Sequence, residues 1–214
     1  MSGNRHVYVV SGASRGIGNE FTRQLLDRSP DSIVFALMRK TQSADNILSK
    51  YQDRYIPVHL DLLLQESINK AGESIKDTLK NRGHDLKIDM LVNAAGILGG
   101  EVGDKGPERS ISGIDRTWLE STLQINLVGH VMVTQQMIPL MKRTTKEMPS
   151  KIINLSARVG SIGDNSLGGW YSYRMSKAAL NMFTKTTAIE LKRHNVICLS
   201  MHPGTTGRMY SIYS

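Results

Sequence analysis

Tyr173 and Lys177 are two residues of this 214-residue chain that could together move a proton. They lie in a helix-periodic apolar stretch from 172 to 193, and side chains four residues apart on a helix share one face. A phenol with a pKa of about 10 is a poor acid at neutral pH, but a neighbouring ammonium group stabilises the phenolate and lowers that pKa. Such pairs are common by chance, so the surrounding motifs must decide what this one does.

A glycine-rich turn near the amino terminus could hold a phosphate. Residues 6–20, HVYVVSGASRGIGNE, read as an apolar strand, a turn and the start of a helix. Glycines at 12, 16 and 18 would allow a tight turn, close approach to a pyrophosphate and packing of helix on strand. The helix N-terminus adds unpaired N–H groups and the positive end of the helix dipole. The segment therefore predicts a dinucleotide site.

The end of the predicted second strand, 32–38, indicates which dinucleotide. In such folds an acidic residue about 20 positions past the turn binds the ribose of NAD, whereas a basic residue accommodates the extra phosphate of NADP. Here the strand runs into Arg39 and Lys40, and Arg15 lies inside the turn itself. We therefore expect NADP rather than NAD. A solvated charge at the strand end is the alternative role for Arg39.

Strands and helices alternate along the chain, which is typical of a doubly wound parallel sheet. We expect an α/β, Rossmann-like fold of about six parallel strands in one domain, residues 1–214. The later strands are predicted at 55–60, 87–92, 151–155 and 195–201. Helices are predicted from the glycine turn to about 28, then at 65–82, 116–143 and 172–193, with a further possible helix at 41–50. The polar loop 99–113 is a candidate rim or lid.

Two further features could serve the same site. Asn93-Ala94-Ala95-Gly96 follows the fourth strand, and ligands bind at the carboxyl ends of strands in open parallel sheets. A generic turn is the alternative there. Asn126 lies within a predicted helix, where asparagine is a poor helix former; a buried amide bonded to backbone would be sufficient reason.

The bulk composition excludes several classes of function. The net charge is +8, yet no long basic run interleaved with aromatic residues is present, so we expect no nucleic-acid partner. No apolar run approaches the roughly 20 residues needed to span a bilayer, and the polar residues 1–5 leave no room for a cleaved leader, so we expect no membrane association. The single cysteine, Cys198, reads as a core residue and suits a reducing, cytoplasmic location.

In this order, the motifs resemble those of the short-chain dehydrogenases/reductases, essentially from end to end. The resemblance rests on residues 11–18 (SGASRGIG), Asp61-Leu62, Asn93 to Gly96, Asn126, Tyr173 to Lys177, and Pro203-Gly204. Within that family, residues 154–181 look most like the C-factor-like carbonyl reductase branch.

The resemblance implies hydride transfer between NADP and a small-molecule carbonyl or alcohol, with NAD as the less favoured cofactor. It implies that Tyr173 donates the proton, that Lys177 lowers the pKa of Tyr173 and binds the nicotinamide ribose, and that Asn126 positions Lys177 through a water. It implies no metal, and a homodimer or homotetramer built on the long helices. The expected cofactor-binding residues are Gly12, Ser14, Arg15, Gly16, Ile17, Gly18, Arg39, Asp61, Leu62, Asn93, Ala94, Ala95, Gly96, Tyr173, Lys177, Pro203 and Gly204.

The chain departs from the family pattern at two places. Family members typically carry two serines after the fifth strand, and the second steadies the substrate oxygen; this chain has Ser156-Ala157. Adjacent strand residues point to opposite faces, so Ser156 cannot simply replace that hydroxyl, although Ser161 in the loop could; loss of the bond would cost about 2–4 kcal/mol. The chain also stops ten residues after Gly204, so the family's last helix and seventh strand are expected to be absent, leaving an edge strand and no lid.

Two functions therefore remain open from the sequence. The first is an NADPH-dependent carbonyl reductase, and the second is a catalytically weak NADP-binding protein that signals or regulates. The identity of the substrate depends on the loops 99–113 and 158–170 and cannot be read from the motifs.

Overall fold

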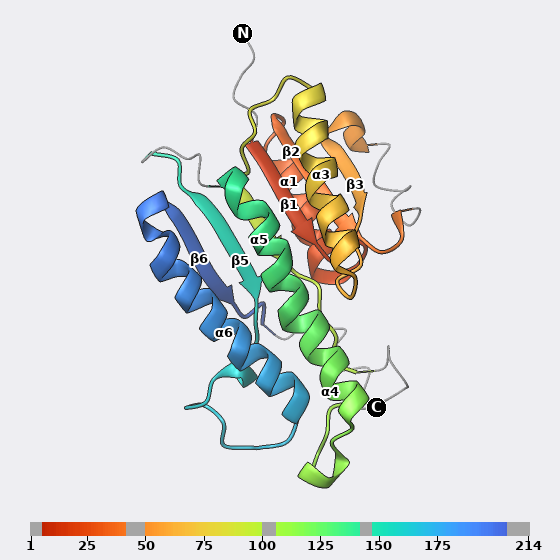
Figure 1. The fold of residues 1–214 in the computed structure, drawn as a ribbon, viewed down its shortest axis with the longest axis vertical. Helices are drawn as coiled ribbons and strands as arrows, with labels where there is room; N and C mark the ends of the chain where they lie inside the picture. Colours follow the sequence, from red (N-terminus) through yellow and green to blue (C-terminus); the bar gives the residue numbers. More distant parts are fainter. Residues whose placement is uncertain (1–5, 42–49, 100–105, 142–146, 205–214) are drawn as a thin grey trace.

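The computed structural model describes residues 6–41, 50–99, 106–141 and 147–204. They form a six-stranded parallel sheet in the order β3-β2-β1-β4-β5-β6 (Figure 1). The strand order runs outward from β1 in both directions, which is the predicted doubly wound, Rossmann-like arrangement. The strands are β1 (His6–Ser11), β2 (Ser32–Met38), β3 (Tyr55–His59), β4 (Met90–Asn93), β5 (Ser150–Leu155) and β6 (Val196–Met201).

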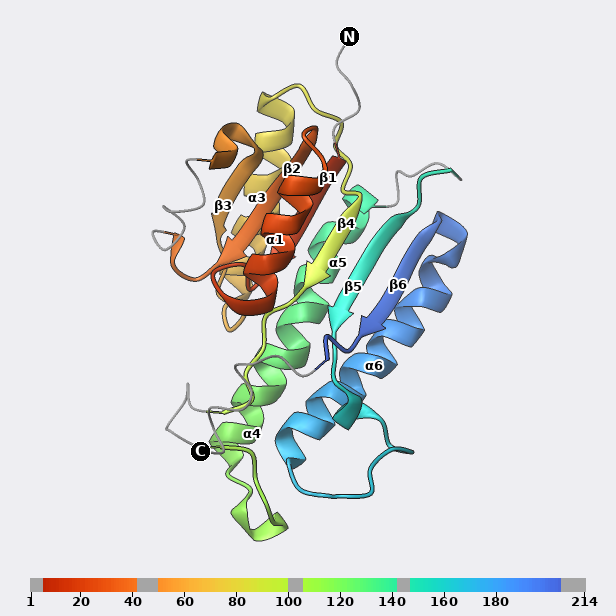
Figure 2. The same ribbon diagram turned by 180° about the vertical axis from the view of Figure 1, so that it is seen from behind.

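Helices cover both faces of this sheet. On one face lie α3 (Gln65–Asn81), α5 (Gly129–Met141) and α6 (Tyr171–Leu191), and on the other lies α1 (Gly16–Arg28) (Figures 1 and 2). The remaining helical segments are α4 (Arg116–Leu123), the π-helix η4 (Gln124–Val128), and four 3₁₀ turns, η2 (Gln52–Arg54), η3 (Ile111–Gly113), η5 (Arg158–Gly160) and η6 (Lys192–His194).

The core has two parts, one on each face. All seven residues of β2 are buried, as expected of a strand covered on both sides. Alternate residues such as Ile33 and Phe35 pack against α3 and α5, whereas Val34 and Ala36 pack with Leu26 of α1. Cys198 belongs to the first part, where burial raises the pKa of its thiol to about 11. It is a core residue, as predicted.

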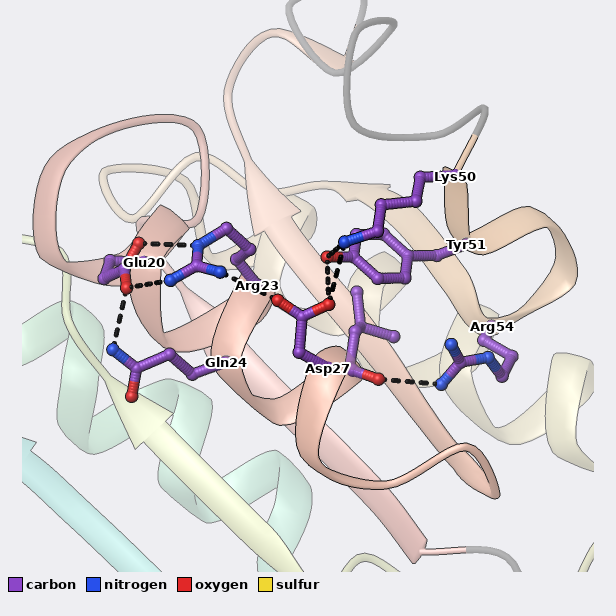
Figure 3. A network of polar contacts seen from close by, with 8 residues as sticks. Glu20, Arg23, Gln24, Asp27, Lys50, Tyr51 and Arg54 are labelled. Atoms are coloured by element: carbon purple, nitrogen blue, oxygen red, sulfur yellow. Dashed lines mark hydrogen bonds and ion pairs between the residues drawn. The ribbon is translucent and has the colours of Figure 1, made fainter.

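Contacts of α1 fix the segment that leads into β3. The carboxylate of Asp27 accepts hydrogen bonds from Lys50 Nζ at 3.0 Å and from the Tyr51 hydroxyl at 2.8 Å (Figure 3). The bonds from Lys50 and Tyr51 hold the pKa of Asp27 below its usual range. Arg54 also donates to the carbonyl of Leu26 at 3.1 Å. The predicted helix at 41–50 falls mainly on residues 42–49, outside the described residues.

Most predicted boundaries agree within two residues, but β4 begins three residues later than expected. Lys87 and Asp89 form an ion pair at 2.8 Å, and the N–H of Lys87 donates to the carbonyl of Asp85 in a turn. The Asp89 carboxylate accepts the N–H of Val7 at 2.8 Å. The Lys87 contacts form a turn before the strand, whereas the backbone of Asp89 already bonds to Val7 and Lys151 of the neighbouring strands. The strand β4 itself spans four buried or half-buried residues.

The predicted helix 116–143 is continuous as far as Met141 but is not uniform. Its middle five residues, η4, form a π-helix that contains Asn126. Such segments are rare and occur frequently at functional sites. Within the described residues, no helix is long and apolar enough to cross a bilayer.

Candidate active site

The carboxyl ends of the strands point to one edge of the sheet, and the segments that follow β1, β4 and β5 gather there (Figure 2). Ligands bind at this edge in open parallel sheets. The glycine turn, the residues after β4 and the start of α6 therefore lie where a bound dinucleotide would be expected.

The glycine turn after β1 depends on backbone contacts that a side chain would block. A β-carbon at Gly12 would lie 2.7 Å from the backbone nitrogen of Ala95, and one at Gly18 would overlap the carbonyl oxygen of Gly12. Gly12 also has a φ of +70°. The turn is anchored by the N–H of Ala13, which donates to the carbonyl of Leu37 at 3.2 Å. The first and third glycines thus pack the turn against β4 and α1, as predicted.

Gly16 differs from these two glycines because it faces open space. Its φ is +58°, and a β-carbon there would have nothing within 4 Å. Gly16 begins α1, whose N-cap residue Arg15 makes no side-chain cap and whose first turn holds no acidic residue. Ser14, Arg15 and Gly16 are exposed, and Ile17 packs against the α1-side core. An exposed helix N-terminus without a side-chain cap fits a pyrophosphate.

The residues expected to recognise the adenosine end lie after β2 and β3. Arg39 follows β2 directly and is exposed, which fits contact with an additional phosphate. Asp61 accepts the N–H of Leu63 at 3.0 Å, which shapes the turn after β3. Leu62 is buried in the core beside Gly129, where a β-carbon would lie 2.7 Å from that of Leu62. A cofactor contact by Leu62 would therefore have to come from its backbone.

The last residue of β4 and the three that follow it divide between core and site. The Asn93 side chain is fully buried, and its Nδ2 donates to Thr134 Oγ1 at 3.0 Å and to Asn154 Oδ1 at 2.8 Å. This network faces the α5 side of the sheet, so the role of that side chain here is to join strands and helix. Ala94 and Ala95 are half-buried, and Gly96 is exposed at the edge.

Asn126 of η4 holds the chain just after Gly96. Its Oδ1 accepts the N–H of Ile97 at 2.8 Å, and its Nδ2 donates to the carbonyl of Ile97 at 2.9 Å and to Ser176 Oγ at 3.2 Å. It is thus a buried amide bonded to backbone, the simpler of the two roles predicted for it. A β-carbon at Gly96 would lie 3.3 Å from Asn126 Oδ1 and 3.8 Å from Lys177 Nζ. Gly96, Asn126 and Lys177 therefore meet at one point.

Tyr173 and Lys177 share a face of α6, with Lys177 Nζ 5.6 Å from the centre of the Tyr173 ring. Lys177 is buried and donates to the carbonyl of Leu155 at 2.8 Å. Burial raises the pKa of Tyr173 to about 12 and lowers the pKa of Lys177 to about 8. That Lys177 lowers the pKa of Tyr173 stays a prediction, because the raised pKa of Tyr173 reflects the burial of the phenol.

Among the described residues, neither candidate serine is hydrogen-bonded to Tyr173 or Lys177. Ser156 and Ser161 both line a groove of about 600 Å³ between α6 and β6, whose lining includes Asn181 and Thr184 but neither Tyr173 nor Lys177. Ser156 is 7% exposed, and among the described residues its hydroxyl has no hydrogen-bond partner. Ala157, at the position of the family's second serine, is in extended backbone.

Pro203 and Gly204 follow β6 at the same edge of the sheet as the other motifs. Both are half-buried, Gly204 has a φ of +80°, and a β-carbon there would have nothing within 4 Å. Space at this turn is consistent with the expected cofactor contact, which stays a prediction.

Two buried polar residues at the site were missed by the sequence analysis. His130, one turn after Asn126, lies with its Nε2 2.8 Å from the carbonyl of Ala95. Glu108, from the loop expected to form a rim, binds the start of α6. The four-residue spacing of Asn126 and His130 was a usable signal, but nothing local marked Glu108, because its partner is 64 residues away. Among the described residues, no group of three or more histidine, cysteine or acidic side chains could hold a metal.

Known proteins resemble the chain over nearly its whole length. A family model described as short chain dehydrogenase matches residues 6–209. A 1-hydroxy-2-glutathionyl-2-methyl-3-butene dehydrogenase of Rhodococcus sp. (strain AD45) is 30% identical over 197 residues, covering 92% of this chain and 76% of its own. The C-signal protein of Myxococcus xanthus is 31% identical over 117 residues, covering 55% of this chain and 64% of its own.

A solved structure is also similar to this chain. The NADPH-bound carbonyl reductase from chicken fatty liver superposes with a TM-score of 0.80 at 28% identity. The match covers 94% of this chain and 76% of the chicken protein.

Proposed function

Because the chain belongs to the short chain dehydrogenase family, we propose that it is an NADPH-dependent reductase of aldehydes or ketones. It is an NAD(P)-dependent oxidoreductase of the carbonyl reductase-like branch. The dependence on NADPH and the reduction of a carbonyl are the parts that we propose.

The observation that carries this proposal is the meeting of four predicted residues at one edge of the sheet. Tyr173 and Lys177 share a face of α6, and both Lys177 and Asn126 lie beside Gly96. The uncapped start of α1 lies at that edge too. A proton donor and a pyrophosphate site are thereby held in one fixed arrangement.

When bound, NADPH would supply the hydride that adds to the carbonyl carbon. The glycine turn and the start of α1 would bind the pyrophosphate, and Lys177 the nicotinamide ribose. As the carbon receives the hydride, Tyr173 donates its phenolic proton to the carbonyl oxygen, which leaves an alcohol and a phenolate. A pKa of about 12 keeps Tyr173 protonated at neutral pH, and the Lys177 ammonium stabilises the phenolate that forms.

The preference for NADPH is supported by charge at the expected ribose site. Arg39 follows β2 and is exposed, and the exposed Arg15 is the residue directly before α1. An arginine binds phosphate through two parallel hydrogen bonds, so both side chains suit a 2′-phosphate. The chicken carbonyl reductase, whose structure was determined with NADPH bound, supports the same choice.

A second candidate function rests on Ala157. With no hydroxyl at that position, and with the hydroxyl of Ser156 buried, the substrate oxygen would lack one donor. An NADP-binding protein with weak turnover, acting as a regulator, would tolerate that loss.

The test of the proposed function compares two neighbouring tyrosines of α6. Tyr173→Phe removes the proton donor, so carbonyl-dependent oxidation of NADPH should fall by at least about 100-fold while NADPH binding persists. Tyr171→Phe is the control, since it removes a hydroxyl from the first residue of the same helix and should leave turnover unchanged. Equal turnover in wild type and Tyr173→Phe would favour the regulatory role.

We also propose that the protein is a cytoplasmic homodimer. Met175, Met182 and Ile189 repeat every seven residues along α6 and are 43%, 67% and 67% exposed. An apolar seam of that spacing suits packing against another helix. The single buried cysteine suits a reducing compartment.

A further inference from the structure

The helix that carries Tyr173 begins without a cap of its own. Its N-cap residue, Trp170, makes no side-chain hydrogen bond, and the first turn of α6 contains no acidic residue. Trp170 is also left-handed, with a φ of 54°, and follows two glycines at φ 65° and 63°. A non-glycine residue in that region costs about 1–2 kcal/mol, so something else must hold this turn.

Glu108 supplies the missing contacts from 64 residues away. Its Oε2 accepts the N–H of Ser172 at 3.2 Å, and its Oε1 accepts the Ser172 hydroxyl. Its own carbonyl accepts the N–H of Trp170 at 2.5 Å. A β-carbon at Gly169 would lie 3.4 Å from that carbonyl, so the two segments are closely packed.

The environment makes these contacts costly to lose. Glu108 is 6% exposed and Ser172 is fully buried. A buried carboxylate is tolerated only when it is hydrogen-bonded, and here the N–H and hydroxyl of Ser172 and the helix dipole provide the compensation. The Trp170 ring lies edge-on to the Tyr173 ring at 6.2 Å, so the clamped turn also contacts the proton donor.

We propose that Glu108 is a positioning residue, which fixes the first turn of α6 and thereby the place of the Tyr173 hydroxyl. This inference rests on the proposed function, because it assigns Tyr173 a reaction to be positioned for. The loop that follows residue 106 would then support the start of α6 rather than act as a lid over the site.

The test replaces this carboxylate and a matched one. Glu108→Ala should lower kcat by about 10- to 100-fold, as expected when a reacting group is displaced, and leave the Kd for NADPH within about twofold. The control is Asp115→Ala, which removes the carboxylate that caps α4 by accepting the N–H of Trp118 at 2.9 Å. That variant should keep the wild-type kcat.

A readout independent of activity is amide hydrogen exchange. Exchange at residues 171–174 should be faster in Glu108→Ala than in wild type and unchanged in Asp115→Ala. Glu108→Gln keeps the shape and one acceptor, so its kcat and exchange should lie between those of wild type and Glu108→Ala. If Glu108→Ala fails to fold, the kcat and amide exchange of Glu108→Gln test the proposed positioning role.

Wild-type kcat and exchange in Glu108→Gln or Glu108→Ala would overturn the inference, as would an equal loss of kcat in Asp115→Ala. A wild-type protein that binds NADPH but reduces no carbonyl would instead contradict the proposed function. The exchange measurement would then still report whether Glu108 holds the helix.

Discussion

Tyr173 and Lys177 show how burial sets the chemistry of single residues in this protein. Removal of water favours the neutral form of each group, so the pKa of the phenol rises to about 12 and that of the ammonium falls to about 8. A neutral phenol is the form that donates a proton. A phenol that stays protonated at neutral pH can act as the proton donor that the proposed reduction requires.

At the same scale, Ala157 offers a gain-of-function test. Ala157→Ser would restore a hydroxyl at the position where family members carry one, so we expect kcat to rise by about 10-fold. Ser156→Ala is the matched control and should leave kcat unchanged, because the Ser156 hydroxyl is buried and bonds to no other group among the described residues. The kcat values of the two variants at saturating carbonyl would show which of the two positions can supply the hydroxyl. A fall in kcat in Ser156→Ala, without a rise in Ala157→Ser, would assign that hydroxyl to Ser156.

At the scale of the elements, the glycine turn allows a role in stability and a role in cofactor binding to be tested separately. Gly16 and Gly83 have nearly equal φ values, 58° and 65°, and a β-carbon at either would have nothing within 4 Å. Both alanine variants should lose about 1 kcal/mol of unfolding free energy. Only Gly16→Ala should weaken NADPH binding, by about 10-fold, because of the two glycines Gly16 is the one in the proposed phosphate-binding turn.

Denaturant titration and NADPH titration of Gly16→Ala and Gly83→Ala measure the two effects separately. Unaltered NADPH affinity in Gly16→Ala would place the pyrophosphate elsewhere.

The continuous helix that carries Asn126 also contains His130, whose burial predicts that acid pH lowers the stability of the protein. Burial, with a smaller contribution from the charge of Lys177, lowers the pKa of His130 on α5 from 6.5 to about 3. The unfolded chain therefore binds a proton at His130 between pH 6.5 and 3 that the folded chain does not. The contribution of neutral His130 to the free energy of unfolding is therefore complete above pH 6.5. It falls as the pH is lowered from 6.5 towards 3, by up to about 1.4 kcal/mol per pH unit.

Replacement of His130 should remove that part of the pH dependence. His130→Gln keeps a side-chain donor that can reach the carbonyl of Ala95 but does not titrate. Urea unfolding of both proteins at pH 7 and pH 4.5 should show a smaller loss of free energy in the variant. Equal losses in the two proteins would mean that His130 is already protonated in the folded state.

Elements with a strong local pattern were predictable from the sequence, and those set by distant contacts were not. The bounds of β2 and α1 were predicted correctly because uniform apolar character and a Ser-Pro break mark them. The π-helix at Asn126 was not predicted, because a single wider turn shifts the apolar spacing by only about one residue. The capping role of Glu108 required the fold, because only the sheet brings that loop to α6.

At the scale of the whole molecule, the two faces of the sheet are covered unequally. The helices α3, α5 and α6 lie on one face, whereas among the described residues no helix lies over β5 and β6 on the α1 face (Figure 2). Among the described residues β6 is the outermost strand on its side of the sheet, and its Ile197 and Leu199 are 42% and 47% exposed. The apolar seam of α6 is a separate surface.

The α6 seam gives the prediction for assembly. Met182→Asp introduces a charge at the middle of the seam, on a side chain that is 67% exposed in the single chain. We expect the dimer to dissociate while the melting temperature of the monomer changes little. Light scattering after gel filtration measures the mass of wild type and variant. A wild-type protein that elutes as a monomer would contradict the proposed dimer.

The measurement that tests the central claim most directly is a titration with NADPH and, separately, NADH, followed by addition of aldehydes, ketones and quinones. We predict tighter binding of NADPH than of NADH, and loss of the bound NADPH absorbance when a suitable carbonyl is added. Tight NADPH binding without oxidation by any of these carbonyls would contradict the reductase and leave the regulatory role. The absence of NADPH binding would contradict the account of the site itself.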